Sequence, residues 1–124
     1  MLNYGAIQTA LIDIDRASEY SGDDVDRVSK LVDLGQQFKY VLITVPTIDT
    51  ATVGLLGQLT SSEAEVPFAV PYQKTDNTTA AWALSSGTGL MVISVFVGGL
   101  QYVRVQTTNA NQTADRTFKL QGFN

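Results

Sequence analysis

The 124-residue sequence contains no histidine and no cysteine. The lack of histidine removes the side chain best suited to proton transfer near neutral pH, and with it any Ser-His triad. Together the two absences remove the commonest zinc ligands, metal-thiolate sites and disulfide bonds. Charged residues are also scarce, at 16% of the chain, which favours a surface that a partner partly covers. We therefore expect no enzyme, no catalytic residues and no bound metal or cofactor.

The sequence has no cluster or stripe of basic residues, which nucleic-acid binding requires. The net charge of −4 comes entirely from residues 1–33, which hold seven acidic and three basic residues. The other 91 residues balance, with five of each sign, so no basic stripe can neutralise phosphates. The longest apolar run, Leu90 to Val97, is too short to span a membrane, and no signal peptide is visible after Met1. We expect a soluble protein, made in the cytoplasm, that contacts neither nucleic acid nor a membrane.

The sequence is rich in short segments that alternate apolar and polar residues between turn signals. They run from Tyr40 to Phe123, and the hydrophobic content of 44% suits a folded core. Such spacing is typical of a sandwich or barrel. We predict one all-β domain over residues 1–124, a β-sandwich of jelly-roll or Greek-key type with about eight or nine strands. Residues 1–30 are expected to form an N-terminal arm and an acidic loop.

Several segments predict individual strands. Ile7 to Ile14 fits both the strand and the helix period, and we favour a strand. Tyr40 to Val45 predicts a strand whose valine and isoleucine side chains are buried, namely Val41, Ile43 and Val45. The Gly98-Gly99 pair predicts a hairpin turn. Further strands are expected at Val28 to Leu34 (closed by Gly35), Thr52 to Leu59, Thr79 to Leu84, Leu90 to Val97, Leu100 to Gln106 and Thr117 to Gln121.

Val66 to Tyr72 alternates strictly and contains two prolines. Pro67 and Pro71 lack the N–H group that a central strand needs, so the segment predicts an edge strand or an extended arm. The four apolar residues between and beside the prolines are expected to share one face: Val66, Phe68, Val70 and Tyr72.

Carboxylates and aromatic rings supply the candidate sites. Acidic residues at the N-terminal end could supply oxygen ligands to calcium, although their spacing does not match an EF-hand; a solvated loop or a surface facing a basic partner is the simpler interpretation. They are Asp13, Asp15, Glu19, Asp23, Asp24 and Asp26. Glu63 and Glu65 share a face, as a glycosidase pair would, but they lie in a serine-rich turn and predict an exposed hairpin tip.

Aromatic residues could also form a sugar-binding platform. The candidates are Trp82, Tyr72, Tyr102 and Phe68. Trp82 has alanine neighbours in an apolar segment, which favours a buried position in the core over an exposed one.

The C-terminal third carries a more specific pattern. Leu100 to Val105 is followed by a loop rich in Asn, Gln and Ala, and then by Gln112 to Leu120, which contains Ala-Asp-Arg-Thr. Together with Val32 to Gly35 and the strand that ends at Val45-Pro46, this pattern resembles small virion structural proteins of tailed bacteriophages. The similar stretches cover about half of the chain, and the proline-bearing stretch from Glu63 to Thr79 departs from the usual aromatic hairpin. Two arginines in the pattern, Arg104 and Arg116, need only a structural role, because an arginine on a strand can bridge a carboxylate.

The resemblance implies a non-enzymatic β-sandwich of the capsid decoration (cement) or head auxiliary type, located in the virion. Its implied partners are the major capsid protein or other virion proteins, and further copies of itself, with a trimer favoured. The contacts are expected at Tyr4 in the arm Met1 to Ala6, at the proline-bearing segment and in the acidic loop; the residues are Tyr4, Pro67, Phe68, Pro71, Tyr72, Asp23 and Asp24. The alternative is a carbohydrate- or receptor-binding β-sandwich of a phage fibre, tail or baseplate, which predicts an exposed Trp82 or Tyr72.

Overall fold

All the regular elements of the protein are β-strands within the residues that the computed structural model describes, which are 3–73, 79–81, 84–86, 91–108 and 110–124. This confirms the predicted all-β class. The same residues contain no helix that is long and apolar enough to cross a membrane. The strands are β1 (Tyr4–Ile12), β2 (Val32–Val45), β3 (Ala51–Gln58), β4 (Phe68–Ala69), β5 (Pro71–Gln73), β6 (Thr79–Ala81), β7 (Leu84–Ser86), β8 (Met91–Thr108) and β9 (Arg116–Phe123).

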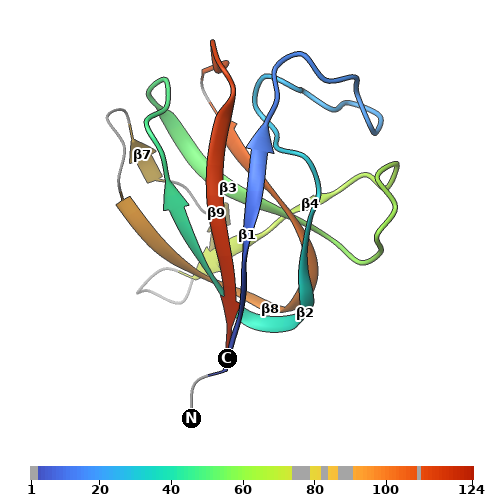
Figure 1. The fold of residues 1–124 in the computed structure, drawn as a ribbon, viewed down its shortest axis with the longest axis vertical. Coiled ribbons are helices and arrows are strands. Elements are labelled where there is room, and N and C mark those ends of the chain that lie inside the picture. Colours follow the sequence, from blue (N-terminus) through green and yellow to red (C-terminus); the bar gives the residue numbers. More distant parts are fainter. Residues whose placement is uncertain (1–2, 74–78, 82–83, 87–90, 109) are drawn as a thin grey trace.

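One open antiparallel sheet contains most of these strands (Figure 1). Its order is β1-β9-β2-β8-β3-β4, with β7 also paired to β3, while β5 and β6 form a separate pair. β1 therefore forms one edge, and β4 and β7 share the other along different parts of β3. This pairing does not establish the two-sheet jelly roll or Greek key, and four of the strands are only two or three residues long.

The sheet curves because its two longest strands, β2 and β8, carry bulges near their middles. In the first bulge, residues 33–38 of β2 lie opposite residues 100–102 of β8, so β2 carries three extra residues. In the second bulge, residues 96–100 of β8 lie opposite residues 38–40 of β2, so β8 carries two extra residues. Unpaired residues of this kind bend a strand and increase its twist. Both strands accordingly curve round one end of the molecule (Figure 1).

Glycines at these bulges overturn two predictions. Gly35, with a φ of 92°, does not close a strand, because β2 continues through it to Val45. Gly98 and Gly99, with φ values of 65° and 102°, do not form a hairpin, because β8 runs through both. Glycine adopts positive φ at little cost, which suits a bulge as well as a turn. A glycine pair alone therefore does not distinguish a bend within one strand from a turn between two.

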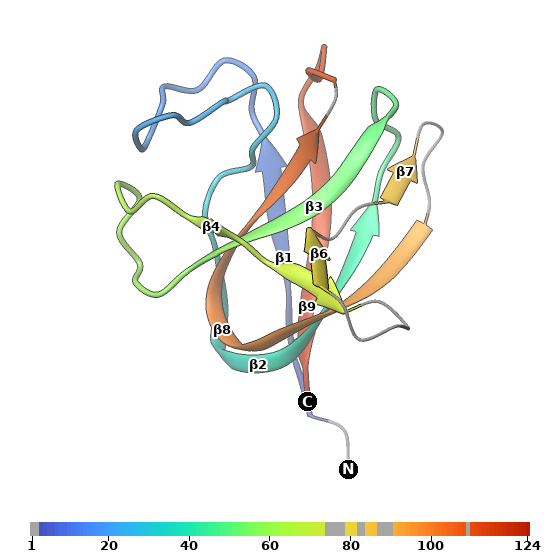
Figure 2. The same ribbon diagram turned by 180° about the vertical axis from the view of Figure 1, so that it is seen from behind.

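The buried apolar side chains of the described residues form one hydrophobic core between the two halves of the curved sheet. β3 crosses the direction of β1 and β9 in both views (Figures 1 and 2), and buried residues of all three strands belong to one cluster. Fully burying such a side chain contributes about 1.5–3 kcal/mol. The cluster includes the predicted Val41, Ile43 and Val45, together with Ala10, Ile12, Val53, Leu55, Phe118 and Leu120.

The N-terminal third is more ordered than predicted. The favoured strand at Ile7 to Ile14 is confirmed, but the segment expected to be an arm is already β1 from Tyr4, paired with β9. The acidic loop follows β1, and no strand lies between Ile12 and Val32. Val28 makes a single bridge to Gln106, and β2 begins only at Val32.

The proline-bearing segment is confirmed as an edge, since it contributes β4 at the end of the sheet. Phe68 and Val70 share one face as predicted, because both side chains approach the position that a Cβ of Gly57 would take, at 3.2 and 3.3 Å. They differ in exposure, since Phe68 is exposed and Val70 is buried. Trp82 lies outside the described residues.

Candidate functional site

Three rows of side chains cross the outer surface of β1, β9, β2 and β8. The strand register places one residue of each strand in each row. We term these twelve residues the outer face. The first row is Tyr4, Phe123, Tyr40 and Phe96; the second is Ile7, Gln121, Leu42 and Ser94; the third is Thr9, Lys119, Thr44 and Val92.

The alternation of each strand turns large apolar side chains of the outer face toward solvent. Because Val41 and Ile43 point into the core, their neighbours on β2 point outward. Four apolar residues of the outer face are more than half exposed: Tyr4 at 51%, Ile7 at 64%, Val92 at 63% and Phe96 at 61%. Contiguous exposed apolar surface of this kind marks a contact site in folded proteins.

The first row is an aromatic ladder that spans four strands. The ring centroids of Tyr4 and Phe123 lie 5.7 Å apart, and those of Phe123 and Tyr40 lie 5.1 Å apart, with interplanar angles of 29° and 19°. Phe96 meets Tyr40 edge-on, with centroids 5.5 Å apart and an angle of 64°. The rings of the first three residues thus turn their faces toward one another and present their edges to solvent.

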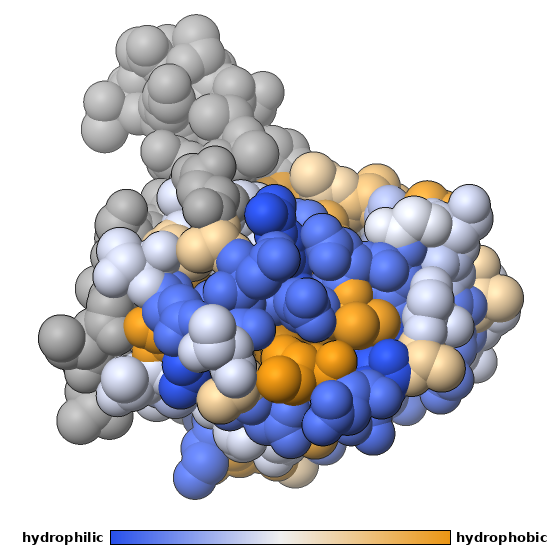
Figure 3. Space-filling model, turned by 90° about the horizontal axis from the view of Figure 1, so that it is seen from above, coloured by the Kyte–Doolittle hydropathy of each residue, from blue (hydrophilic) through white to orange (hydrophobic). Residues whose placement is uncertain are grey.

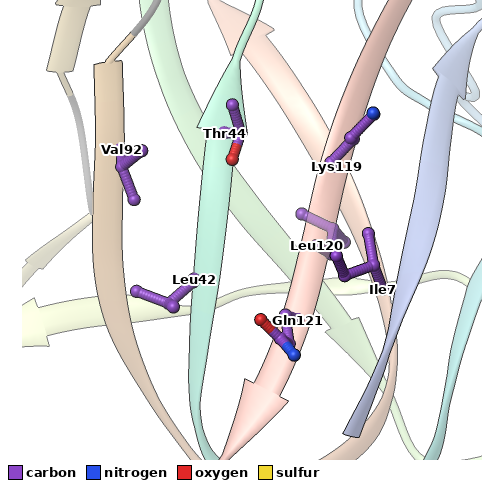
Figure 4. A pocket seen from close by; sticks show the side chains of 7 residues that line it. All are labelled: Ile7, Leu42, Thr44, Val92, Lys119, Leu120 and Gln121. Atoms are coloured by element: carbon purple, nitrogen blue, oxygen red, sulfur yellow. The ribbon is translucent and has the colours of Figure 1, made fainter. Parts of the chain in front are cut away.

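A shallow hollow lies beside the ladder, between the second and third rows (Figure 4). Ile7, Leu42 and Val92 form much of its lining, and Leu120 contributes from the core side. The side chains of Leu42 and Val92 point toward each other across β2 and β8 (Figure 4). Lys119 lies at the rim and is the charged residue among the twelve of the outer face.

A second exposed apolar surface lies at the β4 edge. We term Leu59, Val66 and Phe68 the β4 surface; they are 76%, 59% and 45% exposed. A hollow next to Phe68 continues past the glycine bulge of β8 to Phe96 and Leu100. The two apolar surfaces therefore meet at Phe96. The end of the molecule seen from above carries many hydrophilic residues around a smaller apolar patch (Figure 3).

The acidic loop is attached to the sheet by Arg104, whose side chain is completely buried. Its Nη1 donates to Glu19 Oε1 at 2.8 Å and to the Ser29 carbonyl at 3.2 Å, and its Nη2 donates to the Glu63 carbonyl at 3.3 Å. The ring of Tyr20 covers the guanidinium, 4.9 Å from its centroid. Arg104 thus joins the loop after β1 to the loop after β3.

A second ion pair holds the acidic loop in shape. Arg16 contacts both carboxylate oxygens of Asp23 and donates to the Val28 carbonyl at 2.9 Å. Burial acts against the charged form of Asp23, but hydrogen bonds from Arg16 and from the Glu19 amide outweigh it and lower the pKa of Asp23. The same balance, with Arg104 as the donor, lowers the pKa of Glu19. A hydrogen bond and repulsion from Glu19 raise the pKa of Glu63.

The structure places the predicted contact residues in different environments. Tyr4 lies in the aromatic ladder and Phe68 in the β4 surface. Asp24 is exposed, with a side chain 56% accessible, but the Asp23 side chain is fully covered by its ion pair. Pro67 is half-buried beside β4. For Pro71 and Tyr72 only the backbone, in β5, is described.

The remaining candidate residues occupy structural positions. Among the described residues no three His, Cys, Asp or Glu side chains are grouped to hold a metal ion. Glu65 receives hydrogen bonds from Thr60 and from the Leu59 amide, which places it in the turn after β3. Arg116 bridges Asp49 at 2.7 Å, as predicted for an arginine on a strand. Tyr102 is half-buried.

The ladder contains two residues that the sequence did not single out, Phe96 and Phe123. Outward positions could be predicted for neighbours of Val41 and Ile43 by alternation. The register that aligns Phe96 and Phe123 with Tyr40 depends on the bulge in β8 and on the order of the strands. Neither is visible in the spacing of apolar residues.

No family model and no curated protein sequence matches the chain. Among solved structures, the chain is similar to the SPBc2 prophage-derived protein YomS, with 12% identity, 96% of each chain covered and a TM-score of 0.49. It is also similar to a chain of the cyanophage Pam1 capsid asymmetric unit, with 17% identity, 96% of this chain and 84% of that chain covered, and a TM-score of 0.32. At these TM-scores the likeness is loose, and the description of the fold rests on the strands and register of the chain itself.

Proposed function

We propose that this chain is a structural protein of a tailed-bacteriophage virion, of the capsid decoration or head auxiliary type. It has no catalytic role and acts through protein–protein contacts. The observation that carries the proposal is the gathering of exposed large apolar side chains into two surfaces, the outer face and the β4 surface. The resemblance of Leu100 to Leu120 to small virion proteins supplies the virion context.

The β4 surface is the proposed contact with the major capsid protein or another virion protein. It lies at an edge of the sheet, where a strand can accept pairing from another chain. Phe68 and Val66 are large enough to act as anchors in a partner's pocket, and Pro67 keeps the segment extended. The exposed Asp24 belongs to a different part of the surface, on the acidic loop, and offers a polar contact.

The geometry of the aromatic ladder weighs against the ladder itself as a sugar-binding platform. A sugar ring packs on the open face of an aromatic side chain, where its C–H groups meet the π-system. In the ladder the faces of Tyr4, Phe123 and Tyr40 are turned toward one another at interplanar angles of 29° and 19°. The exposed ring edges suit contact with apolar protein side chains instead.

The proposal is tested by incubating the purified chain with phage particles assembled without it and sedimenting the mixture. The chain is expected to sediment with the particles, and Phe68→Asp is expected to weaken this binding at least tenfold, because a charge replaces an interface anchor. Ile7→Asp serves as the matched control on the outer face and should bind as the unmodified chain does.

Two results would contradict the proposal. The unmodified chain could remain in the supernatant at every concentration tested. Alternatively, Phe68→Asp and Ile7→Asp, both with unchanged circular dichroism spectra, could bind particles equally well, which would exclude the β4 surface.

A further inference from the structure

We propose that two copies of this chain pair through their outer faces, about a two-fold axis that lies along the second row. This inference is independent of the virion assignment, because it concerns contact of the chain with itself. A two-fold contact uses the same surface on both copies and closes at two copies. It therefore requires a surface that is complementary to itself, and the three rows of the outer face meet this condition.

The order of the rows supplies the complementarity. A rotation by 180° about the second row leaves that row facing its own copy and places the first row of each chain over the third row of the other. The first row consists of four aromatic side chains, and the third contains Lys119, Thr44 and Val92. At β2 and β8 each copy thus offers a protruding ring, Tyr40 or Phe96, where its partner offers the shorter Thr44 or Val92.

The shape of the outer face agrees with this placement. The hollow between the second and third rows is lined by Leu42, Thr44 and Val92 (Figure 4). Under the proposed rotation an aromatic side chain of the partner's first row lies above this hollow. Phe96 is 61% exposed and Tyr40 is 36% exposed, so both rings stand out from the sheet. A ring that enters an apolar hollow is the usual form of an interface anchor.

The charge of the outer face suits a second copy as the occupant. Lys119 is the charged residue of the twelve, and the rotation places it opposite Phe123 of the other copy, so the two ammonium groups do not face each other. A strongly acidic partner would satisfy Lys119 but would leave the exposed ring edges of the aromatic ladder without complementary groups. The chain itself presents both the rings and the apolar hollow that receives them.

The size of the outer face indicates how tightly the copies bind. Four strands about 4.8 Å apart and three rows about 7 Å apart cover roughly 400 Å². A stable interface buries about 800 Å² on each partner. We therefore expect a reversible dimer that dissociates on dilution, rather than an obligate one.

Sedimentation velocity over a wide concentration range tests the pairing with the full-length chain. A monomer–dimer equilibrium is expected, and Ile7→Asp should weaken it at least tenfold, because the two new carboxylates would face each other across the axis. The matched control is Val66→Asp, which places the same charge at a similarly exposed aliphatic residue, 59% against 64%, on the β4 surface. Val66→Asp should leave the equilibrium unchanged.

Cross-linking tests the position of the axis in an otherwise native chain. The sequence has no cysteine, so a single introduced cysteine is the sole thiol. Gln121→Cys lies on the proposed axis, and a bis-maleimide reagent spanning about 10 Å, the usual separation of packed sheets, should join two copies. Thr117→Cys is the matched control on the same face of β9. Residue 117 lies four residues along the strand from the axis, on opposite sides of it in the two copies. The two introduced thiols would therefore lie about 27 Å apart along the sheet, too far for the reagent to join them.

Three results would overturn the inference. One is a chain that stays monomeric at the highest concentration, and another is a trimer, the state that the resemblance to virion proteins implies. The third is a dimer that tolerates Ile7→Asp or that cross-links as readily through residue 117 as through residue 121. None of these results bears on binding of the chain to phage particles, so the two proposals can fail separately.

Discussion

Arg104 determines how the acidic loop is held against the sheet. Its side chain is fully buried, and its guanidinium donates to Glu19 and to two backbone carbonyls. A buried charge of this kind is tolerated when it is paired and hydrogen-bonded. Both terminal nitrogens of Arg104 meet this condition, whereas its buried Nε has no hydrogen-bond partner. The arrangement explains why an acidic segment that looks suited to a cation lies against the protein instead. Glu19 and Asp23 already have arginine partners.

Replacing Arg104 with methionine should destabilise the protein strongly. Methionine fills much of the volume but leaves the carboxylate of Glu19 and the carbonyls of Ser29 and Glu63 without their donor. Since breaking a buried pair by removing one partner costs about 3–5 kcal/mol, and Glu19 keeps some exposure, we expect a loss of about 3 kcal/mol in the free energy of unfolding. Urea denaturation followed by circular dichroism measures it.

The control for Arg104→Met is Lys39→Met, which removes a positive charge from an exposed position on β2. It should change the free energy of unfolding by less than about 0.5 kcal/mol. Equal effects of the two substitutions would contradict the role assigned to Arg104.

At one end of the core, β1, β2 and β9 approach one another closely around the ring of Phe38. Phe38 is 1% exposed, and its ring lies against the backbone of Gly5 and Gly122. A Cβ added at Gly122 would lie 2.1 Å from a ring carbon of Phe38. Glycine is therefore needed at residue 122 for space, not for an unusual backbone angle.

Gly122→Ala should lower the free energy of unfolding by about 3 kcal/mol, because an added methyl group overpacks a rigid site. Phe38→Leu in the same chain should recover part of this loss, since the smaller side chain vacates the ring carbons that clash. A double-mutant cycle from denaturation curves measures the coupling between the two residues. Strictly additive effects would show that the alanine acts elsewhere than on Phe38.

Local patterns predict the strands of this chain better than they predict its bends. The alternation of Val41, Ile43 and Val45 identifies a buried strand face, and the prolines of Val66 to Tyr72 identify an edge. Gly98-Gly99 predicts a turn from the same local information, yet β8 continues through it. Whether two glycines bend one strand or separate two depends on the partner strand, here β2, which no local pattern reveals.

The candidate surfaces show the same limit. Phe68 and Tyr4 were predicted as contact residues because of their local sequence, and both are exposed. The predicted contact role of Asp23 overlooked Arg16, seven residues away, which covers its carboxylate. Phe96 joins the aromatic ladder only through the register between β2 and β8. Sequence reasoning thus finds exposed residues one at a time, whereas a surface is defined by pairing across strands.

For the molecule as a whole, the carboxylates with shifted pKa values indicate how stability depends on pH. Asp23 and Glu19 have lowered pKa values, because hydrogen bonds from arginines outweigh burial. Asp49 has a lowered pKa through hydrogen bonds from Thr113 and the charge of Arg116. Glu63 alone among the described carboxylates with a resolved shift has a raised pKa, through Glu19. Carboxyl groups with a lowered pKa therefore outnumber the one with a raised pKa, and we expect acid to destabilise the protein.

The direction follows from linkage between folding and protonation. A carboxyl group with a lowered folded-state pKa stabilises the protein above its unfolded pKa and loses this contribution as the pH falls through the folded value. With ordinary values of 3.8 for aspartate and 4.5 for glutamate, we expect stability to decline as the pH falls below about 4.5. Glu63 acts in the opposite sense, because its ionisation beside Glu19 costs stability as the pH rises.

Two variants separate these contributions in denaturation midpoints measured from pH 7 to pH 3. Asp23→Asn should be less stable than the unmodified chain at pH 7 and should lose less stability on acidification, since one of the groups that titrates is gone. Glu63→Gln should be more stable at pH 7, because the repulsion with Glu19 is removed, and should lose more stability on acidification. Parallel pH profiles for all three proteins would contradict the assignment of the acid sensitivity to the carboxylates that hold the loop.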